Sequence, residues 1–315
     1  IAQDEINNSG GINGRQIKII QEDGKCQAKD GLSAAQKLIT VDQVKFMVTS
    51  SCSGELLGYS NIAEQNKVLV LNSLASSPKI TTAGDYIFRN DPNDNDGGKQ
   101  LADLVTKKYK KVAVITENTE FSQGIKQVFV DTFTRNGGIV VSDEVYAPES
   151  TDFRSIVLKI KDTNPDAVFL NPQAPANGVR LANQMRQQGM NQQLYLVYMS
   201  GPEVAKDGAM QGAYIMDAPG FIGGSGQKLL EKFKSVTNRE PGYPYFVGAT
   251  YDAVYILAQA IKTVGDDPTK VKEYLYKMPD YTGTVGTYHF DQNGDLVGVN
   301  YVVRQVVNQK TVEVQ

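Results

Sequence analysis

Residues 44–78, VKFMVTSSCSGELLGYSNIAEQNKVLVLNSLASSP, indicate the fold class most clearly. Two short runs rich in β-branched residues, Val44–Ser50 and Val68–Ser73, predict strands. A loop rich in serine follows each of them, and Glu55–Asn66 between them has the apolar spacing of a helix. Strands that alternate with helices favour a parallel sheet covered by helices on both faces. The stretch therefore predicts an α/β fold.

The same alternation runs outward over most of the chain. Further strands are predicted at Gln16–Asp23, Tyr86–Arg89, Lys111–Thr116, Val140–Ala147, Asp166–Asn171, Leu194–Met199, Gly212–Asp217 and Gly298–Val307. Further helices are predicted at Gly31–Thr40, Gln100–Lys108, Gln123–Asn136, Phe153–Asp162, Gly178–Gln188, Phe246–Val264 and Pro268–Met278. A hairpin turn is predicted at Asp291–Gly294.

The polar run Asn90–Gly98 separates two series of similar pattern and is interpreted as a linker. We therefore expect two doubly wound parallel-sheet lobes joined by a hinge. The first lobe comprises 1–91 and 220–296, and the second comprises 92–219 and 297–315. The glycines of Gly223–Gly226 are expected to break the chain between elements.

The first residues have a helical pattern, with Ile1, Ala2 and Ile6 on one face and a stop signal at Asn8–Gly11. A doubly wound sheet has its first strand in a central position, before such a helix. We therefore expect the first lobe to lack a βα half-unit of about thirty residues. We expect a segment of a longer protein that carried a signal peptide.

Composition excludes several classes of protein. The chain has 315 residues, of which 41% are hydrophobic and 21% charged, with a formal net charge of −3. Its basic residues are scattered, so no nucleic-acid partner is expected, and no apolar run approaches a membrane span. With His289, Cys26 and Cys52 as the only histidine and cysteines, no metal cluster is expected. We also expect no enzyme and no cofactor, because no nucleophile–base pair or phosphate loop is present.

The two cysteines each follow a strand-like run, in loops expected to be neighbours. In a cytosolic protein they would be two inert thiols. Export favours a Cys26–Cys52 disulfide, which would close a loop of about 27 residues and contribute roughly 3–4 kcal/mol in the chain-entropy model.

The loops after the strands supply the candidate binding residues, because open α/β sheets bind ligands at the carboxyl ends of their strands. Ser51-Cys52-Ser53-Gly54-Glu55 and Leu74-Ala75-Ser76-Ser77-Pro78 each place hydroxyls at a helix start, where a carboxylate is well bound. The alternative is that these serines only cap helices. Ser200-Gly201-Pro202-Glu203 places an acid at a third helix start, either for a ligand ammonium or for the helix dipole alone.

The chain resembles the leucine/isoleucine/valine-binding family of periplasmic proteins that feed ABC importers. The stretches that carry the resemblance are Ile6–Gly14, Asp23–Cys26, Cys52-Ser53, Ala75–Pro78, Ser200–Glu203 and Phe290–Leu296. Each stretch is weak alone, but their order and spacing are specific, and the resemblance covers nearly the whole chain. It implies the periplasmic binding protein type I fold and a disulfide between the two cysteines.

The resemblance also implies roles for individual residues. Ser53 and Ser76 would hold the α-carboxylate of an amino acid, with help from backbone groups at Leu74. Glu203 would take the ammonium, and Phe246 would line the side-chain pocket. Two second-lobe positions depart from the leucine binders, which have tyrosines where this chain has Phe121 and Gln173. A pocket-wall aromatic from the N-terminal region is also missing, so the side-chain preference stays open.

We therefore expect a monomeric substrate-binding protein, periplasmic or lipid-anchored outside the cytoplasmic membrane. It would capture an amino acid between its lobes and deliver it to an ABC transporter permease. Two alternatives remain: a ligand-sensing module of the same fold, and a binder of another small molecule such as an amide or an aromatic acid. Glu203 argues against a simple carboxylate ligand, because two facing charges of like sign are costly to bury.

Overall fold

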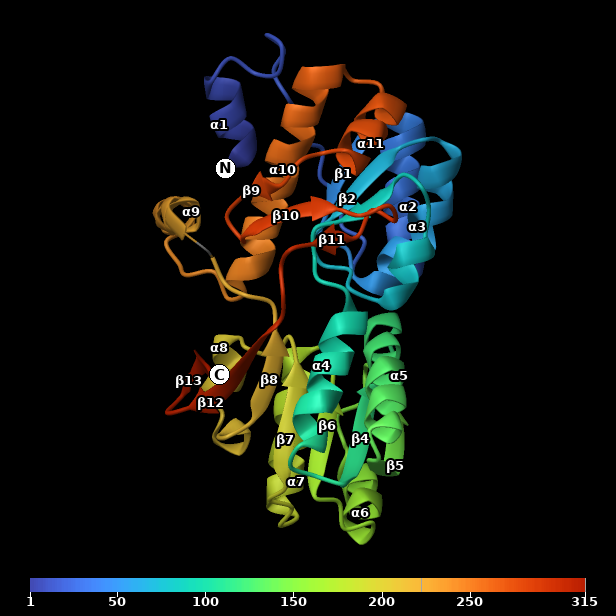
Figure 1. Ribbon diagram of the computed structural model, residues 1–315, viewed down its shortest axis with the longest axis vertical. Helices are drawn as coiled ribbons and strands as arrows, with labels where there is room; N and C mark the ends of the chain where they lie inside the picture. Colours follow the sequence, from blue (N-terminus) through green and yellow to red (C-terminus); the bar gives the residue numbers. More distant parts are fainter. Residues whose placement is uncertain (222, 315) are drawn as a thin grey trace. The chain divides into compact units, whose positions relative to one another are not determined.

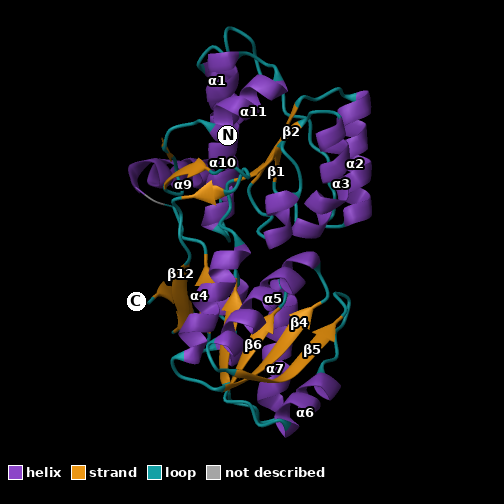
Figure 2. Ribbon diagram, turned by 45° about the vertical axis from the view of Figure 1, so that its right-hand side comes forward, coloured by secondary structure: helices purple, strands orange, loops and turns teal. Residues whose placement is uncertain are grey.

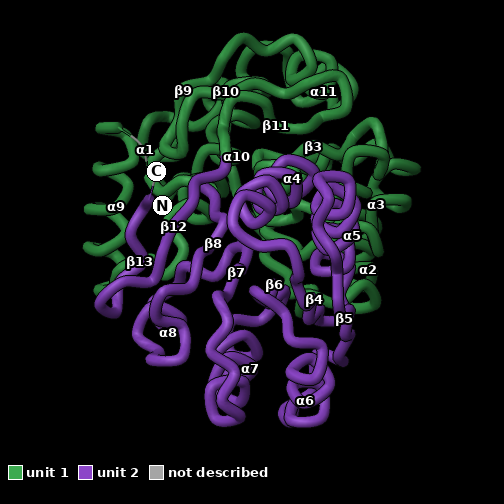
Figure 3. The backbone as a smooth tube through the Cα atoms, turned by 60° about the horizontal axis from the view of Figure 1, so that its bottom comes forward, with its two compact units in different colours: residues 1–93, 219–300 green, residues 94–218, 301–315 purple. Residues whose placement is uncertain are grey.

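A computed structural model describes residues 1–221 and 223–314, which form two compact units (Figure 3). Unit 1 consists of Ile1–Asn93 and Pro219–Asn300, and unit 2 of Asp94–Ala218 and Tyr301–Gln315. The chain therefore passes from one unit to the other at three places, after Asn93, after Ala218 and after Asn300.

Unit 1 contains two small sheets and the helices that pack on them (Figure 1). Its helices and helical turns are α1 (Ala2–Asn8), α2 (Ala28–Gln36), η1 (Lys37–Val41), α3 (Ser53–Gln65), η2 (Pro78–Thr82), α9 (Gly223–Thr237), α10 (Pro244–Val264) and α11 (Pro268–Tyr276). Its strands are β1 (Phe46–Thr49), β2 (Leu69–Asn72), β3 (Ile87–Arg89), β9 (Tyr281–Thr282), β10 (Thr287–Phe290) and β11 (Leu296–Val297).

The main sheet of unit 1 has the order β1-β2-β3, and its strands are parallel. All four residues of β2 are buried, as expected for a parallel strand with a helix on each face. Leu56 and Tyr59 of α3 pack with Met47 and Val70 in one core. On the other side α10 lies against β1 and β2, and the Thr250 hydroxyl is 2.6 Å from that of Ser73.

The predicted strand Gln16–Asp23 is wrong, since these residues are irregular. Their backbone is held by helix α1 instead. The N–H of Ile17 donates to Oδ1 of Asn7 and its carbonyl accepts from Nδ2, both at 2.8 Å. A strand needs a neighbouring strand for its backbone groups, and none of the described residues supplies one here. The β-branched composition was therefore not enough to make a strand.

Unit 2 is built on a single sheet of seven strands in the order β13-β12-β8-β7-β6-β4-β5. Its strands are β4 (Lys111–Glu117), β5 (Ile139–Tyr146), β6 (Ala167–Asn171), β7 (Gln193–Val197), β8 (Tyr214–Asp217), β12 (Val302–Val307) and β13 (Lys310–Glu313). Its helices and helical turn are α4 (Asp94–Thr106), α5 (Glu120–Arg135), α6 (Arg154–Asp162), α7 (Pro175–Gln187), α8 (Pro202–Ala205) and η3 (Gly208–Met210).

Helices cover both faces of this sheet (Figures 2 and 3). Phe129 of α5 packs on Phe169 of β6, with ring centroids 4.6 Å apart. On the other face, Val157 of α6 and Leu181 of α7 share a core with Ile115 of β4. The neighbouring strands β5, β4, β6, β7 and β8 are parallel, whereas β12 pairs antiparallel with β8. The α/β fold class is thereby confirmed.

Two expectations about loops are wrong. The run Asn90–Gly98, expected as a linker, already contains the first turns of α4, which begins at Asp94. Gly223–Gly226 forms the first turn of α9 rather than a break. In both places glycines stand at a helix start, where the backbone N–H groups need no intrahelical partner and low helix propensity costs little.

The expected disulfide is present, with the Cα atoms of Cys26 and Cys52 5.1 Å apart. It joins the loop before α2 to the residue before α3.

A Cys26→Ser/Cys52→Ser variant should lose about 3–4 kcal/mol of unfolding free energy, because the unfolded chain without the disulfide regains the entropy of the closed loop. Urea denaturation measures this loss. The parent protein with a reductant should match the variant, and an unchanged midpoint in both would contradict the prediction.

The buried acid Asp252 of α10 should make stability depend on pH. Its two carboxylate oxygens accept from the N–H of Thr284, at 3.0 and 2.8 Å, and burial raises the pKa of Asp252 to about 6. The unfolded carboxyl titrates near pH ~4. The native state therefore holds the proton more tightly, and this group's contribution to unfolding free energy falls as the pH rises from about 4 to about 6.

We predict that Asp252→Asn removes this pH-dependent contribution to the unfolding free energy. The difference in unfolding free energy between parent and variant should change by about 2–3 kcal/mol between pH ~4 and pH ~7. Denaturation at several pH values measures it. Asp266→Asn, at an exposed ion-paired acid, is the control for titration elsewhere. A constant difference between the parent and Asp252→Asn would contradict the prediction.

Candidate ligand-binding site

Ser53 lies at the first position of α3, directly after the disulfide residue Cys52. Its side chain is 2% exposed, and its Oγ accepts a hydrogen bond of 3.2 Å from the N–H of Ser77. This bond joins the two serine loops that follow β1 and β2. The structure therefore brings Ser53 and the Ser76-Ser77 loop together within unit 1, at the carboxyl ends of two parallel strands.

Asn72, the last residue of β2, shapes the start of the second loop. Its Oδ1 accepts from the N–H groups of Leu74 and Ala75, at 2.8 and 2.6 Å. Its Nδ2 donates to Thr49 and to the carbonyl of Ser51. The N–H of Leu74 is therefore engaged within the protein.

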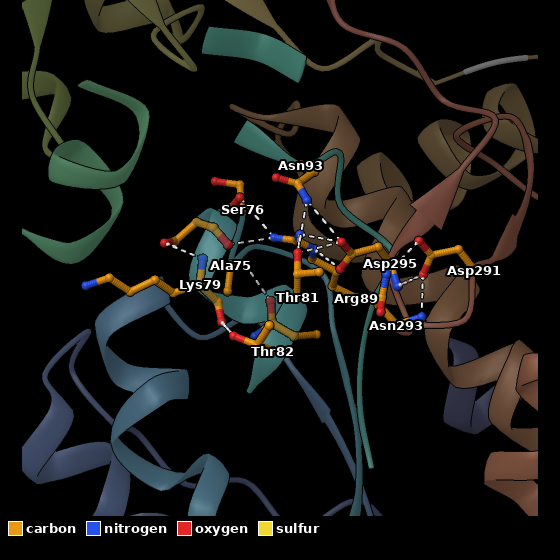
Figure 4. Close-up of polar contacts among 12 residues, drawn as sticks. Ala75, Ser76, Lys79, Thr81, Thr82, Arg89, Asn93, Asp291, Asn293 and Asp295 are labelled. Atoms are coloured by element: carbon orange, nitrogen blue, oxygen red, sulfur yellow. Dashed lines mark hydrogen bonds and ion pairs between the residues drawn. The ribbon is translucent and has the colours of Figure 1, made fainter. Parts of the chain in front are cut away.

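Arg89, the last residue of β3, holds the other end of the same loop (Figure 4). The residue is fully buried. Its Nη1 donates to the carbonyls of Ser76 and Ser77, at 2.9 and 2.8 Å. Its Nε and Nη2 donate to the two carboxylate oxygens of Asp295, at 2.7 and 2.9 Å, and Nη2 also reaches Thr81. Each of the five guanidinium N–H groups thus has an acceptor.

The turn after β10 carries Asp295 to Arg89. Its residue Gly294 has a φ of +78°, and a Cβ atom there would lie 2.6 Å from the carbonyl oxygen of Ile87. The carbonyl of Gly294 accepts from the N–H of Arg89 at 2.9 Å. Only glycine satisfies both the backbone conformation and this close approach to β3. The predicted hairpin turn at Asp291–Gly294 thus fixes the position of Asp295 beside Arg89.

Phe246 lies in the first turn of α10, also in unit 1, and is half-buried. Its ring centroid is 5.7 Å from that of Tyr245 and 6.3 Å from that of Tyr243. The buried Tyr245 hydroxyl donates to the carbonyl of Asn90 at 3.0 Å. Phe246 therefore belongs to an aromatic group whose position is fixed by a buried hydrogen bond.

Glu203 lies in unit 2, in the first turn of the short helix α8, and its side chain is exposed. The loop before it begins at Tyr198, a non-glycine residue with a φ of +54°. The Tyr198 hydroxyl is 2.6 Å from that of Tyr301, which donates to Asp94 at 3.2 Å. Strained backbone of this kind clusters at functional sites, and here two buried tyrosines hold it in place.

Phe121 and Gln173 also lie in unit 2. Phe121 is in the first turn of α5, with its ring centroid 6.0 Å from that of Tyr198. The loop of Gln173 is held by the buried Glu117, whose Oε2 accepts from the N–H groups of Gln173 and Ala174 at 3.1 and 3.4 Å. Glu117 therefore holds the loop after β6 in the same way as Asn72 holds the loop after β2, by accepting from two consecutive N–H groups.

The seven candidate residues thus divide between the units. Unit 1 holds Ser53, Leu74, Ser76 and Phe246, and unit 2 holds Phe121, Gln173 and Glu203. Sequence reasoning missed the residues that position these loops, which are Asn72, Arg89, Glu117 and Asp295. Three of the four end a strand. A polar side chain at the end of an otherwise apolar strand was the available signal.

Within residues 1–221 and 223–314, no group of three or more His, Cys, Asp or Glu side chains is placed to hold a metal ion. His289 lies on β10, where its Nδ1 is 2.8 Å from Oδ1 of Asp280. Of the described helices, none has the length and apolar character that crossing a membrane requires.

A family model described as periplasmic binding protein matches residues 1–311. The chain belongs to the periplasmic binding protein family. Two relatives of this binding protein illustrate the group. The leucine-, isoleucine-, valine-, threonine- and alanine-binding protein of Pseudomonas aeruginosa is 29% identical, over 96% of this chain and 82% of its own length. The Leu/Ile/Val-binding protein of Escherichia coli is 26% identical, over 95% of this chain and 82% of its own.

Solved structures show the same fold. A branched-chain amino acid transporter substrate-binding protein from Streptococcus pneumoniae, in complex with isoleucine, has a TM-score of 0.85 and 25% identity, with 99% of this chain and 92% of that chain covered. A leucine-binding protein from Thermotoga maritima has a TM-score of 0.89 and 23% identity, with 100% and 91% covered. A solute-binding protein from R. palustris, in complex with benzoate, has a TM-score of 0.87 and 19% identity, with 99% and 89% covered.

The Arg89 contacts predict that lysine cannot replace this arginine. A lysine ammonium has three donors and no planar fork, so at least two of the five acceptors would lose their partner. Arg89→Lys should lower the unfolding free energy by about 1–3 kcal/mol and speed amide hydrogen exchange in residues 74–79. Denaturation and exchange mass spectrometry measure the two effects.

Arg186→Lys is the matched control, because Arg186 also donates to backbone carbonyls, namely those of Ala209, Met190 and Gln192 in unit 2. It should lower stability without changing exchange in residues 74–79. Unchanged exchange of this loop in Arg89→Lys would contradict the role given to Arg89.

Proposed function

We propose that this periplasmic binding protein captures a free amino acid outside the cytoplasmic membrane and delivers it to an ABC importer. The observation that supports the proposal most is the pair of serine loops of unit 1, joined by the bond from Ser77 to Ser53. Relatives named for leucine, isoleucine and valine support the ligand class. The disulfide supports an oxidising compartment, since such bonds are rare in the cytosol.

The carboxylate of the amino acid is bound by unit 1 in this proposal. Ser53 and Ser76 supply hydroxyl donors, and α3 adds the partial positive charge of a helix N-terminus. Because Asn72 and Arg89 already hold the loop, little backbone conformational entropy is lost when the ligand binds.

The ammonium is bound by Glu203 of unit 2, and a charge-assisted bond of this type is stronger than a neutral one. The ligand thereby favours the conformation in which both units contact it, to the extent that it binds that conformation more tightly. The protein acts as a monomer and the permease is its partner. It performs no reaction on the ligand.

The ligand side chain is contacted by Phe246 and Phe121 in this proposal, and both are apolar. Gln173 offers a side-chain amide. This combination favours an apolar or small polar side chain over a charged one, because a charge without a partner is costly to desolvate.

A ligand screen tests the proposal. Thermal unfolding is measured with each of the twenty amino acids, and with benzoate for the aromatic-acid alternative. At about 100 times its dissociation constant, the ligand should add about 2.7 kcal/mol to the unfolding free energy. A stabilising amino acid is expected. Stabilisation by benzoate alone, or by none of these compounds, would refute amino-acid capture.

Calorimetry with the best amino acid then tests the residues. Ser53→Ala, Ser76→Ala and Glu203→Gln should each weaken binding about tenfold or more, since each removes a bond to a charged group worth about 1.5–3 kcal/mol. Two exposed positions on α9 provide matched controls, Ser235→Ala and Glu231→Gln, and should bind as the parent does. If all three site variants also bind as the parent does, the residue assignment is wrong although the ligand class stands.

A further inference from the structure

The chain crosses between the two units at three places, and one unit 2 residue beside each crossing is linked to the loop 198–203. These three residues, which we call the crossing residues, are Asp94, Asp217 and Tyr301. The same loop carries Glu203, which we assign to the ligand ammonium. We propose that the crossing residues position Glu203, through contacts with Tyr198 and Ser200 of its loop. This role rests on the proposed function and deepens it.

Tyr198, at the start of the loop, is linked to two of the crossing residues. Its hydroxyl is 2.6 Å from that of Tyr301, which donates to Oδ1 of Asp94 at 3.2 Å. A phenol has one proton, and Tyr301 gives its proton to Asp94, so Tyr198 is the donor to Tyr301. All three residues are buried. The direction of donation along this buried chain therefore fixes the Tyr198 side chain in one arrangement.

Tyr198 needs this support because its φ of +54° lies in the left-handed region, which is unfavourable for a residue with a bulky side chain. Its N–H still donates to the carbonyl of Met216 of β8, at 2.9 Å, so the turn begins where the sheet pairing ends. The chain then runs to α8, whose first turn contains Glu203. Loss of the Tyr301 hydroxyl would remove a contact that stabilises this backbone conformation.

Ser200, in the middle of the loop, is linked to the third crossing residue. Its hydroxyl donates to the carboxylate of Asp217, the last residue of β8. The same carboxylate accepts from the N–H of Ala218 at 2.9 Å and lies 3.7 Å from Nε of Arg304. The carbonyl of Ser200 accepts from the hydroxyl of Thr311 at 3.2 Å. Ser200 is therefore held both at its side chain and at its backbone.

The end of the loop is fixed by packing. Val204, the neighbour of Glu203 in α8, is fully buried and shares a core with Ile215 of β8 and Val306 of β12. The exposed side chain of Glu203 thus follows two hydrogen-bonded positions and precedes a packed one. A carboxylate on a backbone held in this way binds an ammonium with little loss of conformational entropy.

The crossings are the segments that a hinge motion would change, because hinges are a few residues between domains that absorb large changes in φ and ψ. A backbone change at Asp94 or Tyr301 reaches the loop through Tyr198, and a change at Asp217 reaches it through Ser200. Glu203 is thereby coupled to all three crossings.

Tyr301→Phe tests the first link, since it keeps the ring and removes the hydroxyl. The variant should bind an amino acid about three- to tenfold more weakly than the parent. Calorimetry measures this with L-leucine, or with the amino acid that the thermal screen selects in its place. Tyr288→Phe is the matched control, because it removes another buried hydroxyl that donates to a carboxylate, that of Asp252. It should bind as the parent does.

A double-mutant cycle distinguishes positioning from a general structural role. In a protein that already carries Glu203→Gln, adding Tyr301→Phe should change the affinity less than about twofold, because contacts that act through one residue are not additive. An equal loss of affinity in both backgrounds would overturn the proposal.

Asp217→Ala and Asp217→Asn test the second link. Both remove the charge that faces Arg304, but only alanine removes the acceptor for the Ser200 hydroxyl. Asp217→Ala should weaken binding about three- to tenfold, whereas Asp217→Asn should retain most of the parent's affinity. An equal loss in the two variants would contradict the role given to Ser200.

Hydrogen exchange without any amino acid separates this proposal from the proposed function. Exchange in residues 199–205 should be at least about threefold faster in Tyr301→Phe and Asp217→Ala than in the parent. Tyr288→Phe and Asp217→Asn should leave it unchanged. Unchanged exchange in the first two variants refutes the positioning role, whatever the parent binds. A parent protein that binds no amino acid refutes the proposed function instead.

Discussion

A buried guanidinium must find an acceptor for each of its five N–H groups, and the arrangement of unit 1 around Arg89 meets this requirement. The acceptors come from three separate segments, which are the serine loop, the turn η2 and the residue Asp295 after β10. Asn93, at the point where the chain leaves unit 1, donates to the same carboxylate at 3.0 Å. One side chain thereby fixes the loop that we assign to the ligand, relative to the segment that leads into unit 2.

The fold was predictable where the local sequence and the long-range pairing agree. Val68–Leu71 is apolar throughout and lies between two strands, so composition alone located β2. Gln16–Asp23 contains three isoleucines but has no strand partner among the described residues, and it stays irregular. Strand formation depends on the neighbour as much as on the residues themselves.

The sequence suggested candidate residues at helix starts, because serine and glutamate there have a recognisable chemistry. The residues that hold the loops were not predictable in the same way. Asn72 and Arg89 act through contacts with segments that are near in space and separate in sequence, as the bond from Arg89 to Asp295 shows. The sequence shows a polar residue at a strand end but not the groups that it meets.

Asn72 and Glu117 perform the same task in the two units, since each uses one side-chain oxygen to accept from two consecutive N–H groups, Asn72 in the loop after β2 and Glu117 in the loop after β6. Neither residue is among those that we assign to the ligand. The path of each loop is thus set by a buried side chain of the protein interior. A protein built in this way can change its cargo by exchanging a few side chains, and the scaffold that presents them need not be rebuilt.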